Sequence, residues 1–160
     1  MGNQINAGDT AWVLVCCSLV LLMTPALALF YGGMVRRKNV LSTLTLSYTF
    51  MALIGVQWVF YGYSLAFGTD INGIIGGLNF VGLNGVGALP DGAYNKTIPQ
   101  ELFAAFQMRF AVITPALITG AFVERVRLKA FVIFAVLWAI FVYDPVAHWV
   151  WNINGFLHQL

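Results

Sequence analysis

The sequence predicts an all-α, polytopic membrane protein with four transmembrane helices. Of its 160 residues, 60% are hydrophobic and only 9% are charged, whereas a soluble domain carries about 25% charged residues. The apolar residues form four long runs, each with at least the roughly 20 residues needed to cross a hydrocarbon core about 30 Å thick. Most of the Lys and Arg residues lie in two short segments between these runs.

The four expected helices cover residues 11–34, 40–67, 103–122 and 130–151. Asp9 and Thr10 come just before the first run, and both are good N-cap residues, so we expect the first helix to begin there. The second run is long enough that its helix must tilt in the bilayer. Pro25 and Pro115 lie inside runs, which membrane helices tolerate when neighbouring helices satisfy the freed carbonyl groups.

The connection over residues 68–100 is rich in glycine and asparagine. Its apolar stretches are short and interrupted by glycine, so it cannot form a span. We expect it to be an outer loop, with room for short helices.

The distribution of positive charge predicts the orientation of the four helices. One group of cations, Arg36–Lys38, lies between the first and second runs, and a second group, Arg125, Arg127 and Lys129, lies between the third and fourth. Lys and Arg accumulate in cytoplasmic loops. We therefore expect a multi-pass plasma-membrane protein in contact with the lipid bilayer, with these segments in the cytoplasm and the N-terminus outside.

The common catalytic and cofactor-binding motifs are missing from the sequence. It contains no P-loop, no glycine-rich dinucleotide fingerprint and no pair of carboxylates spaced for acid–base catalysis. These observations predict a protein that is not an enzyme, holds no cofactor and has no nucleic-acid partner.

A metal site is a weak alternative at the end of the fourth run. Asp144 and His148 have i,i+4 spacing and could form half of such a site, but Pro145 follows Asp144 and would distort that turn. We therefore expect no metal and interpret His148 and His158 as interfacial histidines.

Two charged residues, Arg109 and Asp144, lie inside expected spans, where charges are functional hypotheses by default. At a rise of about 1.5 Å per residue, both lie roughly 10 Å below the outer surface. Their matched depth predicts a structural ion pair between them. The alternative is that Arg109 extends outward or meets another subunit.

Aromatic residues gather near the outer ends of the third and fourth runs. Trp149 and Trp151 are compatible with an interfacial aromatic belt, and Phe106 and Phe110 with ordinary packing. Aromatic rings also bind small cations, by about 2 kcal/mol or more when the cation is desolvated. The residues alone leave these interpretations open.

Several segments resemble the ammonium transporter (Amt/Mep/Rh) family. The segment "ALFYGGMVRRKNVLS" resembles its first cytoplasmic turn, and "WVFYGYSLAFG" the end of its second helix. The third helix and its loop correspond to "FAAFQMRFAVITPALITGAFVERVRLKAF", and the outer end of the fourth helix to "DPVAHWVWNINGF". The resemblance covers the chain except for the outer loop.

The resemblance implies an ammonium transporter or channel with about eleven helices, which assembles as a homotrimer with a narrow apolar pore in each subunit. Ammonium or methylammonium would be captured outside by Trp151 and the gating Phe110, deprotonated, and passed on as ammonia. Phe106 and Gln107 would lie beside the gate. The lower pore would be lined or bordered by Leu27, Phe30 and Tyr31.

The family also implies partners and limits. A PII-type nitrogen regulator is a possible partner on the cytoplasmic face. The family's Asp-Phe-Ala-Gly-Gly signature and two pore histidines have no counterpart here, and His148 and His158 do not match them. We therefore expect residues 1–160 to be the N-terminal portion of one transmembrane domain.

Two alternative functions remain open from the sequence. One is an ammonium sensor of the same fold, coupled to a cytoplasmic signalling domain. The other is a four-helix structural or redox subunit of a membrane complex, which bound haem or metal would favour.

Overall fold

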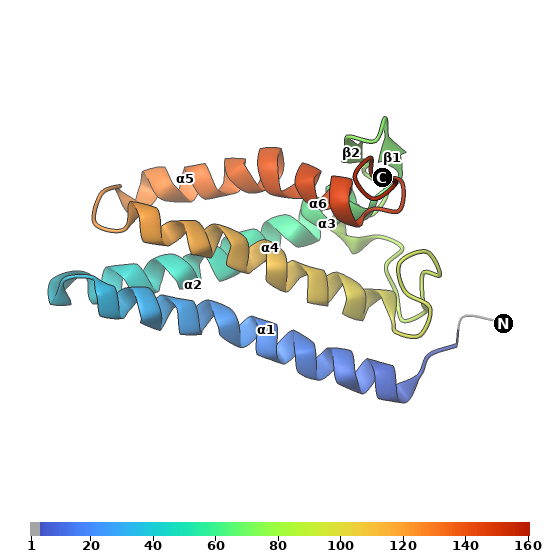
Figure 1. Cartoon of the computed structure of the whole chain (residues 1–160), viewed down its shortest axis with the longest axis horizontal. Helices are drawn as coiled ribbons and strands as arrows, with labels where there is room; N and C mark the ends of the chain where they lie inside the picture. Colours follow the sequence, from blue (N-terminus) through green and yellow to red (C-terminus); the bar gives the residue numbers. More distant parts are fainter. Residues whose placement is uncertain (1–3) are drawn as a thin grey trace.

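The computed structural model describes residues 4–160 as four long helical rods that run up and down side by side (Figure 1). The first rod is α1 (Ala7–Met34) and the third is α4 (Gln100–Phe122). The four apolar spans are Ala7–Met34, Arg37–Phe67, Gln100–Phe122 and Leu128–Trp151. The predicted four-helix membrane architecture is therefore confirmed.

The second and fourth rods each contain a π-helical turn. The second comprises η1 (Arg37–Asn39), α2 (Val40–Gln57), the π turn η2 (Trp58–Gly62) and α3 (Tyr63–Phe67). The fourth comprises α5 (Leu128–Trp138), the π turn η4 (Ala139–Tyr143) and α6 (Asp144–Trp151). Single π turns inside helices are frequent at functional sites.

The start of α1 differs from the sequence-based expectation. The N-cap is Asn6, whose Oδ1 accepts hydrogen bonds from the N–H groups of Gly8 at 2.8 Å and Asp9 at 3.1 Å. The N-cap assignment to Asp9 and Thr10 was wrong, because Asn is an equally good cap. Asn6 is also fixed to the outer segment, because its N–H donates to the Thr97 carbonyl at 2.8 Å.

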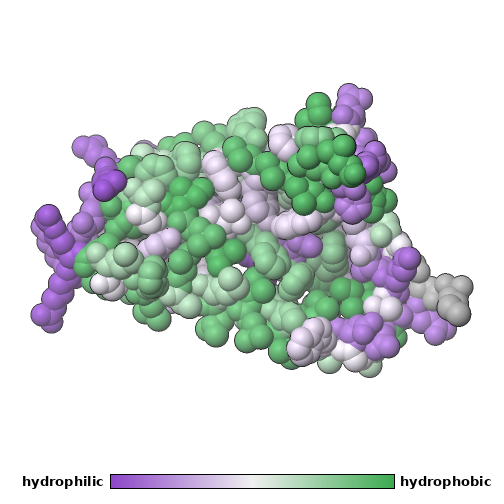
Figure 2. Space-filling view, in the orientation of Figure 1, coloured by the Kyte–Doolittle hydropathy of each residue, from purple (hydrophilic) through white to green (hydrophobic). Residues whose placement is uncertain are grey.

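The core lies between α2, α4 and α5. Phe50 of α2 packs edge-on against Phe131 of α5, with ring centroids 5.0 Å apart. Trp58 is fully buried, and its Nε1 donates to the Ala104 carbonyl of α4 at 3.1 Å. Small residues on α4, such as Ala111 and Ala116, let the rods approach closely. Apolar side chains cover the middle of the molecule, and hydrophilic residues gather at its two ends (Figure 2).

The segment between α3 and α4 folds over one end of the bundle. It contains a two-stranded antiparallel hairpin, β1 (Asp70–Ile71) and β2 (Ile75–Gly76), and a short 3-10 turn, η3 (Val81–Leu83). The hairpin is a small addition to the expected all-α fold. The hairpin packs so closely against α3 that residue 76 must be glycine, because a Cβ there would lie 2.5 Å from the Ser64 carbonyl oxygen.

The two basic segments lie together at the opposite end, where the α1–α2 and α4–α5 connections meet (Figure 1). Glu124 joins them, because its Oε1 accepts hydrogen bonds from the Arg36 N–H at 3.1 Å and from Asn39 Nδ2 at 2.7 Å. These bonds, led by the one from Asn39, lower the pKa of Glu124. The carboxylate therefore fixes one basic connection against the other.

Candidate functional site

The structure brings Phe110 of α4 and Trp151 of α6 into contact. Their ring centroids are 6.3 Å apart and the planes meet at 65°, an edge-to-face geometry favoured by aromatic quadrupoles. Phe106 lies one turn before Phe110, with ring centroids 5.2 Å apart. The three aromatic residues thus form one continuous group across two rods.

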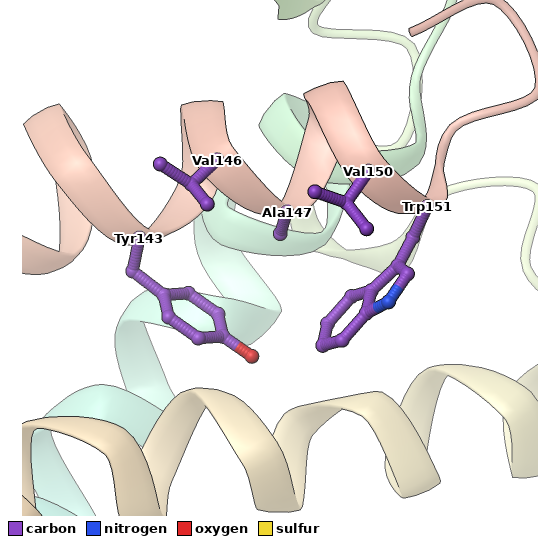
Figure 3. Close-up of a pocket in the computed structure, with 5 residues that line it drawn as sticks. All are labelled: Tyr143, Val146, Ala147, Val150 and Trp151. Atoms are coloured by element: carbon purple, nitrogen blue, oxygen red, sulfur yellow. The ribbon is translucent and has the colours of Figure 1, made fainter. Parts of the chain in front are cut away.

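Trp151 lines two cavities. The smaller one, of about 100 Å³, is lined by apolar atoms of Tyr143, Val146, Ala147, Val150 and Trp151. Figure 3 shows that the rings of Tyr143 and Trp151 both project from their helix toward α4. The arrangement suits a small neutral molecule, because no charged side chain lines this cavity.

The larger cavity, of about 330 Å³, is also lined by Trp151. Gln107 lines it together with Phe103, Tyr94 and His158. The Oε1 of Gln107 is buried without a hydrogen-bond partner, so it can accept from a donor in the cavity. Burial, together with a smaller effect of nearby Asp91, raises the pKa of Tyr94 to about 12. The Tyr94 hydroxyl therefore remains neutral.

His148 and Asn152, which flank Trp151 in sequence, are anchored to the end of α3 and the segment that follows it. His148 is fully buried; its Nδ1 lies 2.9 Å from the Ala66 carbonyl oxygen and its Nε2 lies 2.9 Å from Asp70 Oδ1. Asn152 Nδ2 donates to the Gly68 carbonyl at 3.1 Å. His148 is therefore buried within the protein, and its hydrogen-bond partners lie at the end of α3 and in the hairpin.

The two partners of His148, a backbone carbonyl oxygen and a carboxylate, are both hydrogen-bond acceptors. The bond to His148 and the N–H of Gly73 lower the pKa of Asp70, which keeps the carboxylate ionised. His148 thus joins α6 both to the end of α3 and to the hairpin.

The predicted ion pair between Arg109 and Asp144 was wrong. Among residues 4–160, Asp144 makes no salt bridge with Arg109; its Oδ2 instead accepts a hydrogen bond from Gln57 Nε2 at 2.6 Å. The Nε of Arg109 is buried without a partner. Equal depth on two helices does not ensure contact, because the side chains must also point toward one another.

The expected lower-pore residues lie on α1, away from the aromatic group. Tyr31 donates from its hydroxyl to the Leu117 carbonyl at 2.9 Å and borders a cavity of about 200 Å³ near Glu124. Leu27 packs against the core, whereas Phe30 is exposed on the surface of the bundle.

Within the described part of the chain, no group of three or more His, Cys, Asp or Glu side chains is arranged to hold a metal ion.

A bundle of four long apolar helices is characteristic of a polytopic membrane protein. The chain belongs to the Ammonium Transporter Family, whose family model matches residues 11–160. An ammonium transporter of Bacillus subtilis is 57% identical over 156 residues, and a putative ammonium transporter of Methanothermobacter thermautotrophicus is 48% identical over 158 residues. Each alignment covers 98% of this chain and 38% of the relative.

Solved structures show the same fold. Mep2 of Saccharomyces cerevisiae superposes with a TM-score of 0.86 at 40% identity, over 98% of this chain and 36% of that one. A sensor Amt protein superposes with a TM-score of 0.84 at 22% identity, which shows the fold alone. The chain therefore spans little more than a third of the length of these relatives.

Proposed function

We propose that this protein takes part in transporting ammonium across the plasma membrane. The observation that carries the proposal is the contact between Phe110 and Trp151, and Trp151 lines both cavities. Ammonium would be captured at these rings from the larger cavity. It would lose its proton there and continue as ammonia.

The physical reason for deprotonation is the cost of burying charge. Moving an unpaired cation into a low-dielectric interior costs, in the ideal limit, tens of kcal/mol. Aromatic faces offset part of this cost at the entrance, by about 2 kcal/mol or more for a desolvated cation. The small cavity lined by Trp151 offers apolar atoms only, which supports passage of the neutral molecule.

The orientation and the assembly belong to the same proposal. The basic connections at 36–38 and 125–129 would face the cytoplasm, with the N-terminus outside. Membership of the family supports a homotrimer and a PII-type regulator on the basic face. Leu27, Phe30 and Tyr31 would border the lower part of the pathway.

Transport is favoured over sensing by the named relatives. The relatives at 48–57% identity are named transporters, whereas the sensor likeness lies at 22%. The test is uptake of radiolabelled methylammonium by cells that lack ammonium transporters and express the protein from its complete gene. We expect uptake that added ammonium inhibits. Correctly inserted protein without uptake above the empty-vector cells would overturn the proposal.

A further inference from the structure

One side-chain hydrogen bond joins the second and fourth rods inside the membrane-spanning region. Gln57 Nε2 donates to Asp144 Oδ2 across 2.6 Å, and the side chains are only 4% and 0% exposed. Gln57 is the last residue before the π turn η2, and Asp144 is the first residue after the π turn η4. The pair therefore lies where both rods depart from regular α-helix.

The backbone leaves dedicated space for this pair. Gly62 lies in η2, and a Cβ at this position would be 2.8 Å from Gln57 Nε2 and 3.0 Å from Gln57 Oε1. Real Cβ atoms are almost never that close to another heavy atom. The amide of Gln57 thus occupies space that exists only because residue 62 has no side chain.

The surroundings of Asp144 supply no compensating positive charge. Within residues 4–160, no Lys, Arg or His nitrogen lies at ion-pair distance from its carboxyl group. His148, one turn along α6, is engaged with Asp70, and Arg109 of α4 makes no bond to Asp144. The titratable groups that face it are the phenols of Tyr61 and Tyr143. Burying an ionised carboxylate in a membrane span with a single hydrogen bond and no counter-charge has a high free-energy cost.

Two buried oxygens of the pair have no partner. They are Asp144 Oδ1 and Gln57 Oε1, and both are acceptors if the carboxyl group is ionised. A neutral carboxylic acid and an amide instead pair through two parallel hydrogen bonds, one N–H to C=O and one O–H to C=O. A proton on Oδ1, donated to Oε1, would complete this arrangement and remove the net charge.

We propose that Asp144 is a proton-binding site, occupied in the resting protein, in which the carboxylic acid pairs with the amide of Gln57. Neither side chain lines the cavity of Figure 3, and a proton needs no cavity. The site uses neither Phe110 nor Trp151, so it stands apart from ammonium capture. Its ligand is the proton, and binding it holds the second and fourth rods together.

The test is infrared spectroscopy of the protein expressed from its complete gene and reconstituted in lipid vesicles at neutral pH. The difference spectrum of wild type minus Asp144→Asn should contain the C=O stretch of a protonated carboxylic acid, which shifts in D2O. The matched control is Asp9→Asn, because Asp9 is exposed near the start of α1. Its difference spectrum should contain carboxylate bands only. Carboxylate bands alone for Asp144 would overturn the proposal.

Two further measurements keep the test decisive. In wild-type protein labelled with ¹³C at the aspartate carboxyl carbon, the protonated-acid band should move with the label; absence of any labelled acid band would overturn the proposal. The melting temperature of wild type relative to Asp144→Asn should fall as the pH rises, because only the unfolded chain releases the proton. A relative melting temperature that is flat or rises with pH would equally contradict it.

Discussion

His148 Nε2 lies 2.9 Å from Asp70 Oδ1, and this contact joins α6 to the outer hairpin β1–β2. The second ring nitrogen lies 2.9 Å from the Ala66 carbonyl oxygen at the end of α3. One buried histidine therefore connects two parts of the chain about 80 residues apart in sequence. Because Trp151 follows on the same helix one turn later, the pair also positions the proposed capture site.

Removal of the His148 ring should release the hairpin β1–β2. In His148→Gln, a single amide nitrogen replaces two ring nitrogens that contact separate partners, so we expect faster hydrogen exchange at the backbone amides of residues 68–77. The matched control is His158→Gln, because His158 is the other histidine of the chain and is exposed. Equal protection of residues 68–77 in wild type and His148→Gln would show that the histidine does not hold the hairpin.

Lowering the pH should weaken the His148–Asp70 contact, because it protonates the Asp70 carboxylate. The bond to His148, with that from the Gly73 N–H, lowers the pKa of Asp70. The resulting stabilisation is complete above the ordinary Asp pKa of about 3.9 and is lost as the pH falls through the lowered value in the folded state. Asp70→Asn should lack this acid-dependent part when melting temperatures are compared from neutral to acidic pH. A variant with the same acid dependence as wild type would contradict this account.

Gly62→Ala should disrupt the Gln57–Asp144 pair by crowding. The added Cβ meets Gln57 Nε2 at 2.8 Å and Trp58 Cε3 at 3.0 Å, so we expect a loss of about 1–3 kcal/mol, typical of overpacking. The control is Gly55→Ala on the same rod, where the nearest atom is Met108 Sδ at 3.8 Å. That change should be neutral or stabilising by up to about 1 kcal/mol. Equal denaturation midpoints for the two variants would count against a tight pocket around Gln57.

The four rods could be predicted from the sequence because each apolar run is longer than the bilayer core is thick. The contact between Phe110 and Trp151 followed from the family resemblance, not from composition. The Arg109–Asp144 pair failed, because sequence spacing gives depth along a helix but not which neighbour a side chain faces. The true partner, Gln57, is uncharged, and no sequence pattern links it to Asp144.

The role of His148 was missed for a related reason. Its partners, Ala66 and Asp70, lie in α3 and the outer hairpin, and nothing in the local pattern around residue 148 indicates that a distant hairpin covers it. The i,i+4 spacing indicated Asp144 as the carboxylate partner of His148, whereas the partner is Asp70. An aspartate just after the second span, in an otherwise glycine-rich segment, was the one available signal.

Cysteine labelling tests the proposed orientation. After the native Cys16 and Cys17 are replaced by alanine, a single cysteine at Lys38 or Arg127 should resist a membrane-impermeant thiol reagent in intact cells. A cysteine at Asn84 should react, and all three positions are exposed. Labelling at 38 and 127 with protection at 84 would reverse the orientation and move the capture site to the cytoplasmic face.

Substitution of Trp151 tests the central claim, capture of ammonium at the aromatic group, most directly. Methylammonium uptake should be measured against concentration for wild type, Trp151→Leu and the control Trp12→Leu, since Trp12 is exposed on α1 at the same end of the bundle. Loss of one partly desolvated cation–π contact, about 1–2 kcal/mol, should raise the half-saturating concentration roughly 5–30-fold for Trp151→Leu and leave Trp12→Leu unchanged. An unchanged half-saturating concentration in Trp151→Leu at normal expression would contradict the account.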